Sequence, residues 1–345
     1  MKRIILTGGG TAGHIMPIVA LLPELRRHFG EIHFFGRSEG IERELTAKED
    51  VIYHAADCPR LERGKVFGNV SVPFRLIAAV HRAKKLIAEI KPDVVFSKGG
   101  YVALPASLGA GKVPLVLHES DTSLGLANRL SARKAAVICS SFPLPPCAGK
   151  EVRQTGSPLR RQLYAGRRSA GLARCGFGGR RKVLLVTGGS LGARAINEAV
   201  DANLVALTEK YDVIHIRGRG NGRPPAPGYF PIEFTEDVYD YFAAADFAVT
   251  RGGGNTIFEL GALGIPMLIV PLPKGASRGD QVRNAEYFAQ HSLALAADQS
   301  GLPDRLCGLL GELEFKAPAL IGAMKRYSFD GTAQIAELLA ELAGA

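Results

Sequence analysis

A short apolar run that ends in glycines occurs twice in this chain, at residues 4–9 (IILTGG) and at residues 184–189 (LLVTGG). A helical pattern follows each copy at once. A buried strand that turns through glycines into a helix is the opening unit of the nucleotide-binding α/β folds. Two such units predict two domains, and the 345 residues are enough for two domains of ordinary size.

Further strand-like runs alternate with helical stretches in both halves. They are residues 32–35, 51–54, 94–97, 115–118 and 136–139, and then 213–216, 232–234, 247–250 and 267–270. This alternation favours α/β domains with doubly wound parallel sheets. Residues 153–158 have the composition of a junction. We therefore expect one Rossmann-like domain over residues 1–156 and a second over residues 157–330.

The stretch 251–259 (RGGGNTIFE) places a glycine turn between a predicted strand and a helix. Backbone N–H groups and the dipole at such a helix start attract phosphate oxygens. Glu259, inside the helix, could accept hydrogen bonds from a ribose diol. The pattern therefore fits a nucleoside diphosphate. A second interpretation needs no ligand: Thr256 as N-cap and Glu259 three residues later would form a capping box.

The first glycine loop, residues 8–13 (GGGTAG), fits the pattern G-x-G-x-x-G. A dinucleotide site would also need an acid at the end of the second strand, where this chain has Arg37. Since Arg37 could accommodate a 2′-phosphate, NADP stays an alternative. His14 follows the loop at a helix start, where the dipole disfavours protonation of the imidazole. His14 could act as a general base, or it could simply pack or cap there.

The net charge of +10 indicates an acidic partner. No nucleic-acid-binding module is recognisable, so we expect no nucleic acid and favour phosphate and anionic lipid. Residues 64–91 form an amphipathic, basic segment, with Val66, Phe67, Val72, Phe74, Leu76, Ile77 and Val80 among Arg75, Arg82, Lys84 and Lys85. Four basic residues near an anionic surface contribute on the order of 4 kcal/mol, which predicts reversible membrane attachment. The same pattern fits a helix that covers a sheet and turns its charges to water.

Five cysteines without a C-x-x-C pair indicate neither a disulfide framework nor a zinc site, and reduced thiols are the simplest account. The apolar run before the first glycines is too short for a signal peptide, and none approaches the ~18 residues needed to span a bilayer. We expect the protein to stay in the compartment where it is made.

Six motifs occur in order along the chain: residues 8–14, 98–101 (KGGY), 118–121 (HESD) with 125–128 (GLAN), 188–192 (GGSLG), 251–259 and 279–284 (GDQVRN). Together they resemble the MurG family, the N-acetylglucosaminyltransferases of peptidoglycan synthesis, from residue 3 to about residue 290. The motif HESD looks like a Gram-positive variant. The chain departs from the commoner family pattern at Ala12, Ser120, Asp121 and Asp280.

The resemblance implies the GT-B fold, in which two Rossmann-like domains face each other across a cleft, and in which the last helix, about residues 331–345, packs back on the first domain. It implies inverting transfer of GlcNAc from UDP-GlcNAc to the 4-hydroxyl of MurNAc-pentapeptide-pyrophosphoryl-undecaprenol, which converts lipid I to lipid II on the cytoplasmic face of the cell membrane. The partners would be UDP-GlcNAc, lipid I, the anionic membrane surface and, as a further candidate, a cell-wall or division complex.

The resemblance also assigns site residues. His14 would be the catalytic base, with Glu119 as its rival. Asp121, Tyr101 and Asn128 are candidates for acceptor binding. The donor UDP-GlcNAc would be held by Thr11, Ala12, Gly13, Arg160, Ser190, Thr256, Glu259, Gln281 and Asn284. No D-x-D triplet is present. Helix dipoles and Arg160 would stabilise the departing UDP, so we expect neither a metal nor another cofactor.

Two alternatives remain open from the sequence. Another GT-B enzyme, a glycolipid glycosyltransferase or a UDP-GlcNAc 2-epimerase, would share the fold; an epimerase would need no lipid-binding segment and more acidic residues around the sugar. A non-catalytic nucleotide-sugar-binding subunit is the second alternative. The presence of His14, Glu259 and Gln281 together argues against it.

Overall fold

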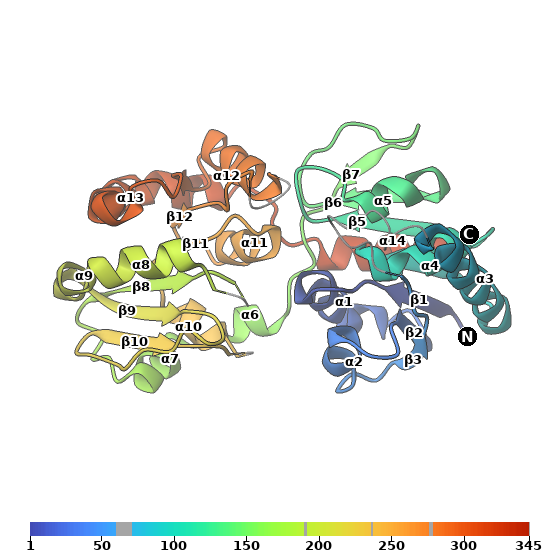
Figure 1. Cartoon of the computed structure of the whole chain (residues 1–345), viewed down its shortest axis with the longest axis horizontal. Helices are drawn as coiled ribbons and strands as arrows, with labels where there is room; N and C mark the ends of the chain where they lie inside the picture. Colours follow the sequence, from blue (N-terminus) through green and yellow to red (C-terminus); the bar gives the residue numbers. More distant parts are fainter. Residues whose placement is uncertain (60–70, 190–191, 236, 276–278, 345) are drawn as a thin grey trace. The chain divides into compact units, whose positions relative to one another are not determined.

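The computed structural model describes residues 1–59, 71–189, 192–235, 237–275 and 279–344 (Figure 1). The chain divides into two compact units, Met1–Arg160 with Asp330–Ala345, and Arg161–Phe329. The main boundary falls after Arg160, a little beyond the expected position, because the preceding residues are tied to the returning segment. The backbone N–H of Leu159 donates to Oγ1 of Thr332 at 2.8 Å, and Ser157 forms a β-bridge with Asp330.

In the described residues, the first unit contains one parallel sheet with the strand order β3-β2-β1-β4-β5-β6-β7. Its strands are β1 (Arg3–Thr7), β2 (Glu31–Gly36), β3 (Ile52–Ala55), β4 (Val94–Ser97), β5 (Leu115–Glu119), β6 (Val137–Ser140) and β7 (Val152–Gln154). Its helices are α1 (Ala12–Leu25), α2 (Ile41–Thr46), α3 (Val72–Ile90), α4 (Leu104–Gly109), α5 (Leu126–Ser131) and α14 (Thr332–Leu342), with the short 3₁₀ helices η2 (Tyr101–Ala103) and η3 (Ala132–Lys134).

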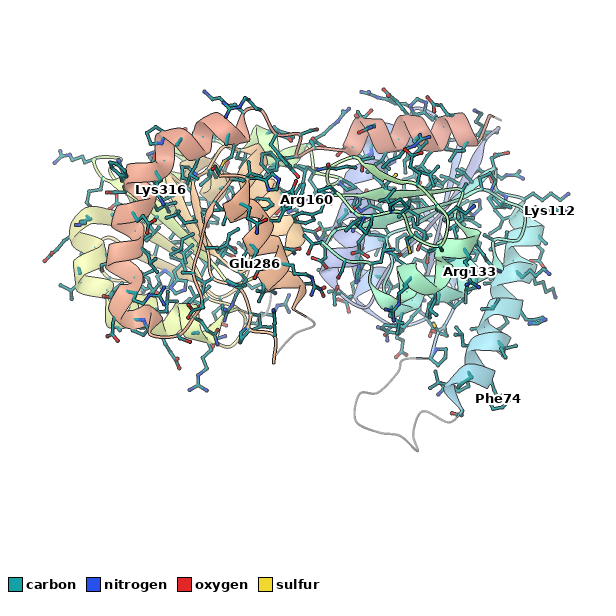
Figure 2. All side chains as sticks on the ribbon, turned by 90° about the horizontal axis from the view of Figure 1, so that it is seen from above. Phe74, Lys112, Arg133, Arg160, Glu286 and Lys316 are labelled. Atoms are coloured by element: carbon teal, nitrogen blue, oxygen red, sulfur yellow. The ribbon has the colours of Figure 1, made fainter. Side chains whose placement is uncertain are left out.

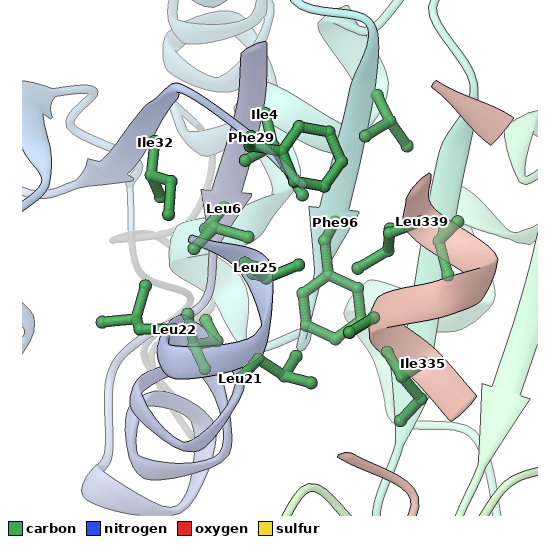
Figure 3. Packing of buried hydrophobic residues seen from close by; sticks show 14 of the residues in the cluster. Ile4, Leu6, Leu21, Leu22, Leu25, Phe29, Ile32, Phe96, Ile335 and Leu339 are labelled. Atoms are coloured by element: carbon green, nitrogen blue, oxygen red, sulfur yellow. The ribbon is translucent and has the colours of Figure 1, made fainter. Parts of the chain in front are cut away.

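Helices cover both faces of this sheet, because alternate residues of its strands point to opposite sides. Ile4 and Leu6 of β1 pack in the cluster that contains α1 and α14, whereas Ile5 packs in the cluster that contains α3 and α4. Figure 3 shows Phe96 of β4 between leucines of α1 and the side chains of Ile335 and Leu339 on α14. The last helix therefore completes the core of the first unit.

The second unit has a parallel sheet with the order β10-β9-β8-β11-β12-β13 within the part that the structure describes. Its strands are β8 (Lys182–Thr187), β9 (Tyr211–Ile216), β10 (Tyr229–Ile232), β11 (Phe247–Thr250), β12 (Met267–Ile269) and β13 (Leu295–Ala296). Its helices are α6 (Gln162–Ala165), α7 (Arg168–Cys175), α8 (Arg194–Ala202), α9 (Leu204–Lys210), α10 (Tyr239–Ala244), α11 (Gly254–Ala262), α12 (Asp280–Gln290) and α13 (Leu302–Met324).

The predicted α/β class with doubly wound parallel sheets is confirmed in both units. One strand prediction was displaced: β10 ends at Ile232, where the predicted strand begins. The pairing starts earlier because Tyr229, opposite Val213 of β9, is buried.

The strand order reverses beside the first strand of each sheet. β1 lies between β2 and β4, and β8 lies between β9 and β11. Open parallel sheets bind ligands beyond the carboxyl ends of their strands at such a reversal. In the first unit these ends lead into residues 8–13 and 98–101, and in the second into residues 188–189 and 251–254. The motifs found in the sequence therefore follow the strands where ligand binding is expected.

Candidate active site

Two glycine loops of the first unit pack against each other at the carboxyl ends of β1 and β4. Gly100 has a positive φ of 79°, and a Cβ atom there would collide with the carbonyl oxygen of Gly9 and lie 3.0 Å from Cδ2 of His14. A Cβ on Gly10 would lie 2.8 Å from the ring of Tyr101. The absence of side chains thus lets the His14 and Tyr101 rings lie directly against the two loops.

His14 lies in the first turn of α1, which begins after Thr11. The backbone N–H of His14 donates to the Thr11 carbonyl at 3.1 Å. Thr11 and Gly13 are exposed, and Ala12 and the His14 side chain are partly exposed. The helix start is therefore accessible, and the imidazole is partly so although its Nδ1 is buried, which suits both a phosphate contact and a general base.

Glu119, the rival base, ends β5 and is buried. Its Oε1 accepts hydrogen bonds from the N–H groups of Ser120 and Asp121 at 3.0 and 3.3 Å. Its Oε2 accepts from the Gly125 N–H at 2.8 Å and from Nδ2 of Asn128 at 2.9 Å. This carboxylate holds together the loop between β5 and α5.

The three acceptor candidates differ in accessibility. Tyr101 and Asp121 are partly exposed. Asn128 is buried, and besides its bond to Glu119 its Nδ2 donates to the His118 carbonyl at 3.0 Å. The structure therefore gives Asn128 a supporting position inside the loop, and its predicted contact with the acceptor remains a prediction.

Arg37, the residue that kept NADP as an alternative, is engaged inside the first unit. Its Nε donates to Oε1 of Glu42 at 2.9 Å, and this bond raises the pKa of Arg37. Its guanidinium lies 5.8 Å from the centre of the Tyr101 ring. Glu42 itself is completely buried beneath the first glycine loop. The pair thus supports the loop and Tyr101, which does not favour a role in binding a 2′-phosphate.

Lys98, the first residue of the motif KGGY, was not among the predicted site residues. It follows β4, its side chain is completely buried, and its ammonium donates to Oγ of Ser120. Burial lowers the pKa of Lys98 to about 8, although the negative charges of Glu119 and Asp121 act in the opposite direction. The motif KGGY indicated a loop but carried no sign that the lysine would be buried.

In the second unit, α11 begins at Gly254 with Gly253 as its N-cap residue. Thr256 is therefore the third residue of the helix, and no side chain caps the helix start. The capping-box interpretation of Thr256 and Glu259 is wrong, because Gly253 occupies the N-cap position and Gly254 is the first residue of the helix. Thr256 and Glu259 are both partly exposed, and their contacts with the donor remain predictions.

Helix α12 packs directly on this glycine turn. Nδ2 of Asn284 donates to the Gly252 carbonyl at 2.9 Å, and a Cβ on Gly252 would collide with the backbone of Gln281. Oε1 of Gln281 accepts the N–H of Leu272 at 2.9 Å, so a hydrogen bond donated to the sugar would come from its amide nitrogen. Gln281 is partly exposed, whereas Asn284 is completely buried. Asn284 thus supports the turn, and its contact with the sugar remains a prediction.

Three further residues complete the donor side. Arg251 is buried and donates to the carbonyls of Val270 and Pro271, at 3.0 and 3.1 Å. It therefore ties the glycine turn to the segment that follows β12. Asp280 does not cap α12, since Gly279 is the N-cap residue; it forms an ion pair with Arg283. Arg160, labelled in Figure 2, is partly exposed at the end of the first unit's main segment. Ser190 lies outside the described residues.

The amphipathic segment is helical over Val72–Ile90, and both interpretations of it apply to different side chains. Val72, Ala79, Ala83 and Ile87 are buried against the unit. Phe74 and Ile77, however, are 73% and 58% exposed, and Figure 2 shows Phe74 near the outer end of α3. The basic residues Arg75, Arg82, Lys84 and Lys85 are exposed as well. Val66 and Phe67 lie outside the described residues.

Among the residues that the structure describes, no helix combines the length and the apolar character needed to cross a bilayer.

Residues 4–140 match the glycosyltransferase family 28 N-terminal domain, and residues 183–339 match the C-terminal domain of the same family. Among solved structures, MurG of Acinetobacter baumannii has a TM-score of 0.78 at 24% identity and covers 99% of this chain and 100% of that one. The glycosyltransferase of kitacinnamycin has a TM-score of 0.74 at 17% identity, with 99% and 98% covered. These structures confirm the predicted GT-B fold.

Curated relatives are similar over nearly the whole chain. The UDP-N-acetylglucosamine--N-acetylmuramyl-(pentapeptide) pyrophosphoryl-undecaprenol N-acetylglucosamine transferase of Clostridium botulinum (strain Langeland) is 40% identical, over 98% of this chain and 99% of that protein. The protein of the same name from Lachnospira eligens is 42% identical over 88% of each chain. This chain therefore belongs to the family of these transferases, within glycosyltransferase family 28.

Proposed function

We propose that this glycosyltransferase moves N-acetylglucosamine from UDP-N-acetylglucosamine to the 4-hydroxyl of the MurNAc sugar in MurNAc-pentapeptide-pyrophosphoryl-undecaprenol. The anomeric configuration is inverted, and lipid II is the product. The observation that carries the proposal is the similarity to transferases of this name over almost the full length of both chains. The positions of the family-like motifs at the two strand-order reversals support it.

On the donor side, the diphosphate binds at the start of α11. The glycine turn exposes backbone N–H groups there, and the helix dipole favours negative charge. Glu259 accepts hydrogen bonds from the ribose hydroxyls, and Gln281 donates to a GlcNAc oxygen through its amide nitrogen. Arg160 and the helix dipole stabilise the UDP that leaves with the electron pair of the broken C1–O bond.

On the acceptor side, His14 accepts the proton of the 4-hydroxyl while that oxygen attacks C1 of GlcNAc. We favour His14 over Glu119 because the imidazole is accessible, whereas both Glu119 oxygens already accept hydrogen bonds from the loop that follows β5. Tyr101 and Asp121 contact the acceptor. His14, Tyr101 and Asp121 belong to the first unit, whereas the donor contacts Glu259 and Gln281 belong to the second.

We further propose that the enzyme works at the cytoplasmic face of the cell membrane, where its lipid acceptor would reside. The exposed Phe74 and Ile77, beside four exposed basic residues of α3, support this location. Apolar side chains can enter the interfacial region, and the basic residues are attracted to anionic headgroups.

The proposed function is tested by measuring UDP release with a short-chain, water-soluble lipid I analogue. Release from UDP-GlcNAc should require the analogue and should be far slower from UDP-glucose, which lacks the acetamido group. Formation of UDP-ManNAc without any acceptor would instead identify an epimerase. Binding of UDP-GlcNAc with neither reaction would support the non-catalytic alternative.

A further inference from the structure

We propose that Lys98 is a positioning residue for the acceptor: its buried ammonium holds Ser120 and thereby fixes the loop that presents Asp121. The inference rests on the proposed function, because it assumes that this loop contacts the lipid-linked sugar. It gives a role to a residue of the motif KGGY that the candidate site residues had not included.

The position of Lys98 links the two loops of the acceptor half-site. A Cβ on Gly8 would lie 3.1 Å from Cβ of Lys98, so the lysine stem packs under the first glycine loop. Its ammonium then reaches Oγ of Ser120, in the loop after β5. The backbone N–H of that same Ser120 donates to Glu119. One side chain therefore spans from the loop that carries His14 to the loop that carries Asp121.

Packing alone does not account for a charge at this place. Lys98 is 1% exposed, and an ammonium removed from water costs free energy that an apolar side chain of equal length would not. The hydroxyl of Ser120 and the nearby carboxylates of Glu119 and Asp121 offset part of that cost. The cation is thus held where it attracts the residues of the acceptor loop.

Burial makes the charge of Lys98 sensitive to pH near neutrality, and the charged groups that face it act against this effect. Glu119 and Asp121, on β5 and the loop after it, favour the charged form, while His118 on the same strand is itself affected by the Lys98 charge. The first glycine loop packs against the stem with Gly8, which does not titrate. Because burial lowers the pKa of Lys98 to about 8, we expect its attraction for the loop to weaken above that pH.

The experiment compares Lys98→Met, Lys98→Arg and Ser120→Ala with the wild type, using the soluble lipid I analogue. Lys98→Met should raise KM for the analogue by about 10- to 100-fold, the range for a hydrogen bond to a charged group, with the affinity for UDP-GlcNAc unchanged. Lys112→Met is the matched control. Lys112 is exposed in the turn before β5, at the opposite end of that strand, so this variant should behave as wild type.

The pH profile separates a positioning role from a merely structural one. For the wild type, kcat/KM for the analogue should fall above about pH 8. Lys98→Met should lack this decrease, and Lys98→Arg should move it to higher pH because a guanidinium stays charged. If Lys98 acts through Ser120, the double variant Lys98→Met/Ser120→Ala should have a kcat/KM no lower than that of the more impaired single variant.

A wild-type KM and an unchanged alkaline decrease in Lys98→Met would overturn the inference, as would additive losses in the double variant. Should Lys98→Met fail to fold, Lys98→Arg with an unshifted profile would overturn it equally. These outcomes are distinct from failure of the proposed function, in which the wild type itself would transfer nothing to the analogue.

Discussion

The two candidate bases, His14 and Glu119, differ in what surrounds them. The His14 ring is partly accessible at the start of α1, while Glu119 is buried and accepts three hydrogen bonds from its own loop and one from Asn128 of α5. We predict that His14→Ala lowers kcat by about 10²–10⁴-fold and leaves UDP-GlcNAc affinity nearly unchanged, since a base acts mainly in the transition state. Steady-state kinetics and calorimetry measure the two quantities.

His28→Ala, at an exposed position after α1, is the control for the His14 variant. The assignment would be reversed if His14→Ala kept near-normal turnover while Glu119→Gln lost it with donor binding intact. If His14→Ala mainly destroyed UDP-GlcNAc binding, His14 would serve the donor phosphates.

Glu259 is the residue through which the donor half of the site can be tested. The start of α11 at Gly254 excludes the capping box. The role predicted for this carboxylate is to bind the ribose hydroxyls of the donor. Glu259→Ala should weaken UDP binding by about 1.5–3 kcal/mol, the range for hydrogen bonds to a charged group. Glu286→Ala, exposed on α12, provides the matched control. Unchanged UDP affinity in Glu259→Ala, measured by calorimetry, would remove Glu259 from the site.

Sequence patterns predicted the residue types of the site better than their accessibility. His14, Tyr101, Glu259 and Gln281 are all at least partly exposed beyond the ends of strands. Asn128 and Asn284 belong to the same motifs but are buried, and they donate to the backbone carbonyls of His118 on β5 and of Gly252. The motifs carried no sign that these two side chains would be buried.

Among the helices, α3 both packs on the first unit and exposes apolar and basic side chains, and its sequence pattern could not separate these two roles. One side of the helix is buried, and the exposed Phe74 and Ile77 lie among basic residues. We predict that replacing Arg75, Arg82, Lys84 and Lys85 with glutamine lowers binding to anionic vesicles, while turnover of the soluble analogue is retained. Added salt should have the same effect on the wild type, since it screens charges. Vesicle sedimentation measures the binding.

A control variant with the same change in charge tests whether α3 itself, or only the net positive charge of the protein, causes binding to anionic vesicles. The exposed residues Arg305, Lys316, Lys325 and Arg326 lie on or just after α13, in the second unit, and their replacement by glutamine should change vesicle binding less. Equal losses in the two variants would mean that the net charge, and not α3, directs the protein to the membrane.

Strand prediction succeeded where a run was apolar and central in its sheet. β4 and β11 have the predicted bounds, whereas the three-residue β7 and the two-residue β13 lie at sheet edges and were missed. Short edge strands carry too few residues for a period-two pattern to be recognised. The shift of β10 has another cause, since the buried Tyr229 determines where pairing with β9 begins.

At the scale of the whole molecule, buried histidines make both units sensitive to acid. His215 of β9 accepts from Tyr229 and contacts Arg217 through Nδ1, and burial lowers its pKa to about 3. The pKa of His118, in the first unit, lies well below its usual value for the same reason. Below pH 6.5 the unfolded chain takes up protons that these folded side chains exclude. Stability should therefore be greatest above pH 6.5 and fall as the pH decreases.

We predict that each of these two histidines lowers the free energy of unfolding by up to about 1.4 kcal/mol per pH unit below pH 6.5. Urea unfolding at pH 7, 6 and 5 measures the slope. His215→Gln should make the decrease shallower, whereas His28→Gln, at an exposed site, should not. A free energy of unfolding that does not change between pH 7 and 5 would contradict the burial of His118 and His215.

The two-unit organisation followed from the repeated glycine motif, but its boundary did not. Residues 157–160 stay with the first unit because Leu159 and Ser157 pair with the segment that leads into α14. That segment lies more than 150 residues further along the chain, beyond the reach of any local pattern. The packing of α14 on α1 and β4 is a contact of the same long-range kind.

Inverting transfer from UDP-GlcNAc to one hydroxyl of a lipid-linked acceptor determines the structure of the product. That structure can be read from the product isolated from a reaction with the soluble lipid I analogue. NMR of that product should show a β-linked GlcNAc on the 4-oxygen of MurNAc, with one equivalent of UDP released. An α-linkage, attachment at another hydroxyl, or a free UDP-sugar epimer in place of the disaccharide would contradict it.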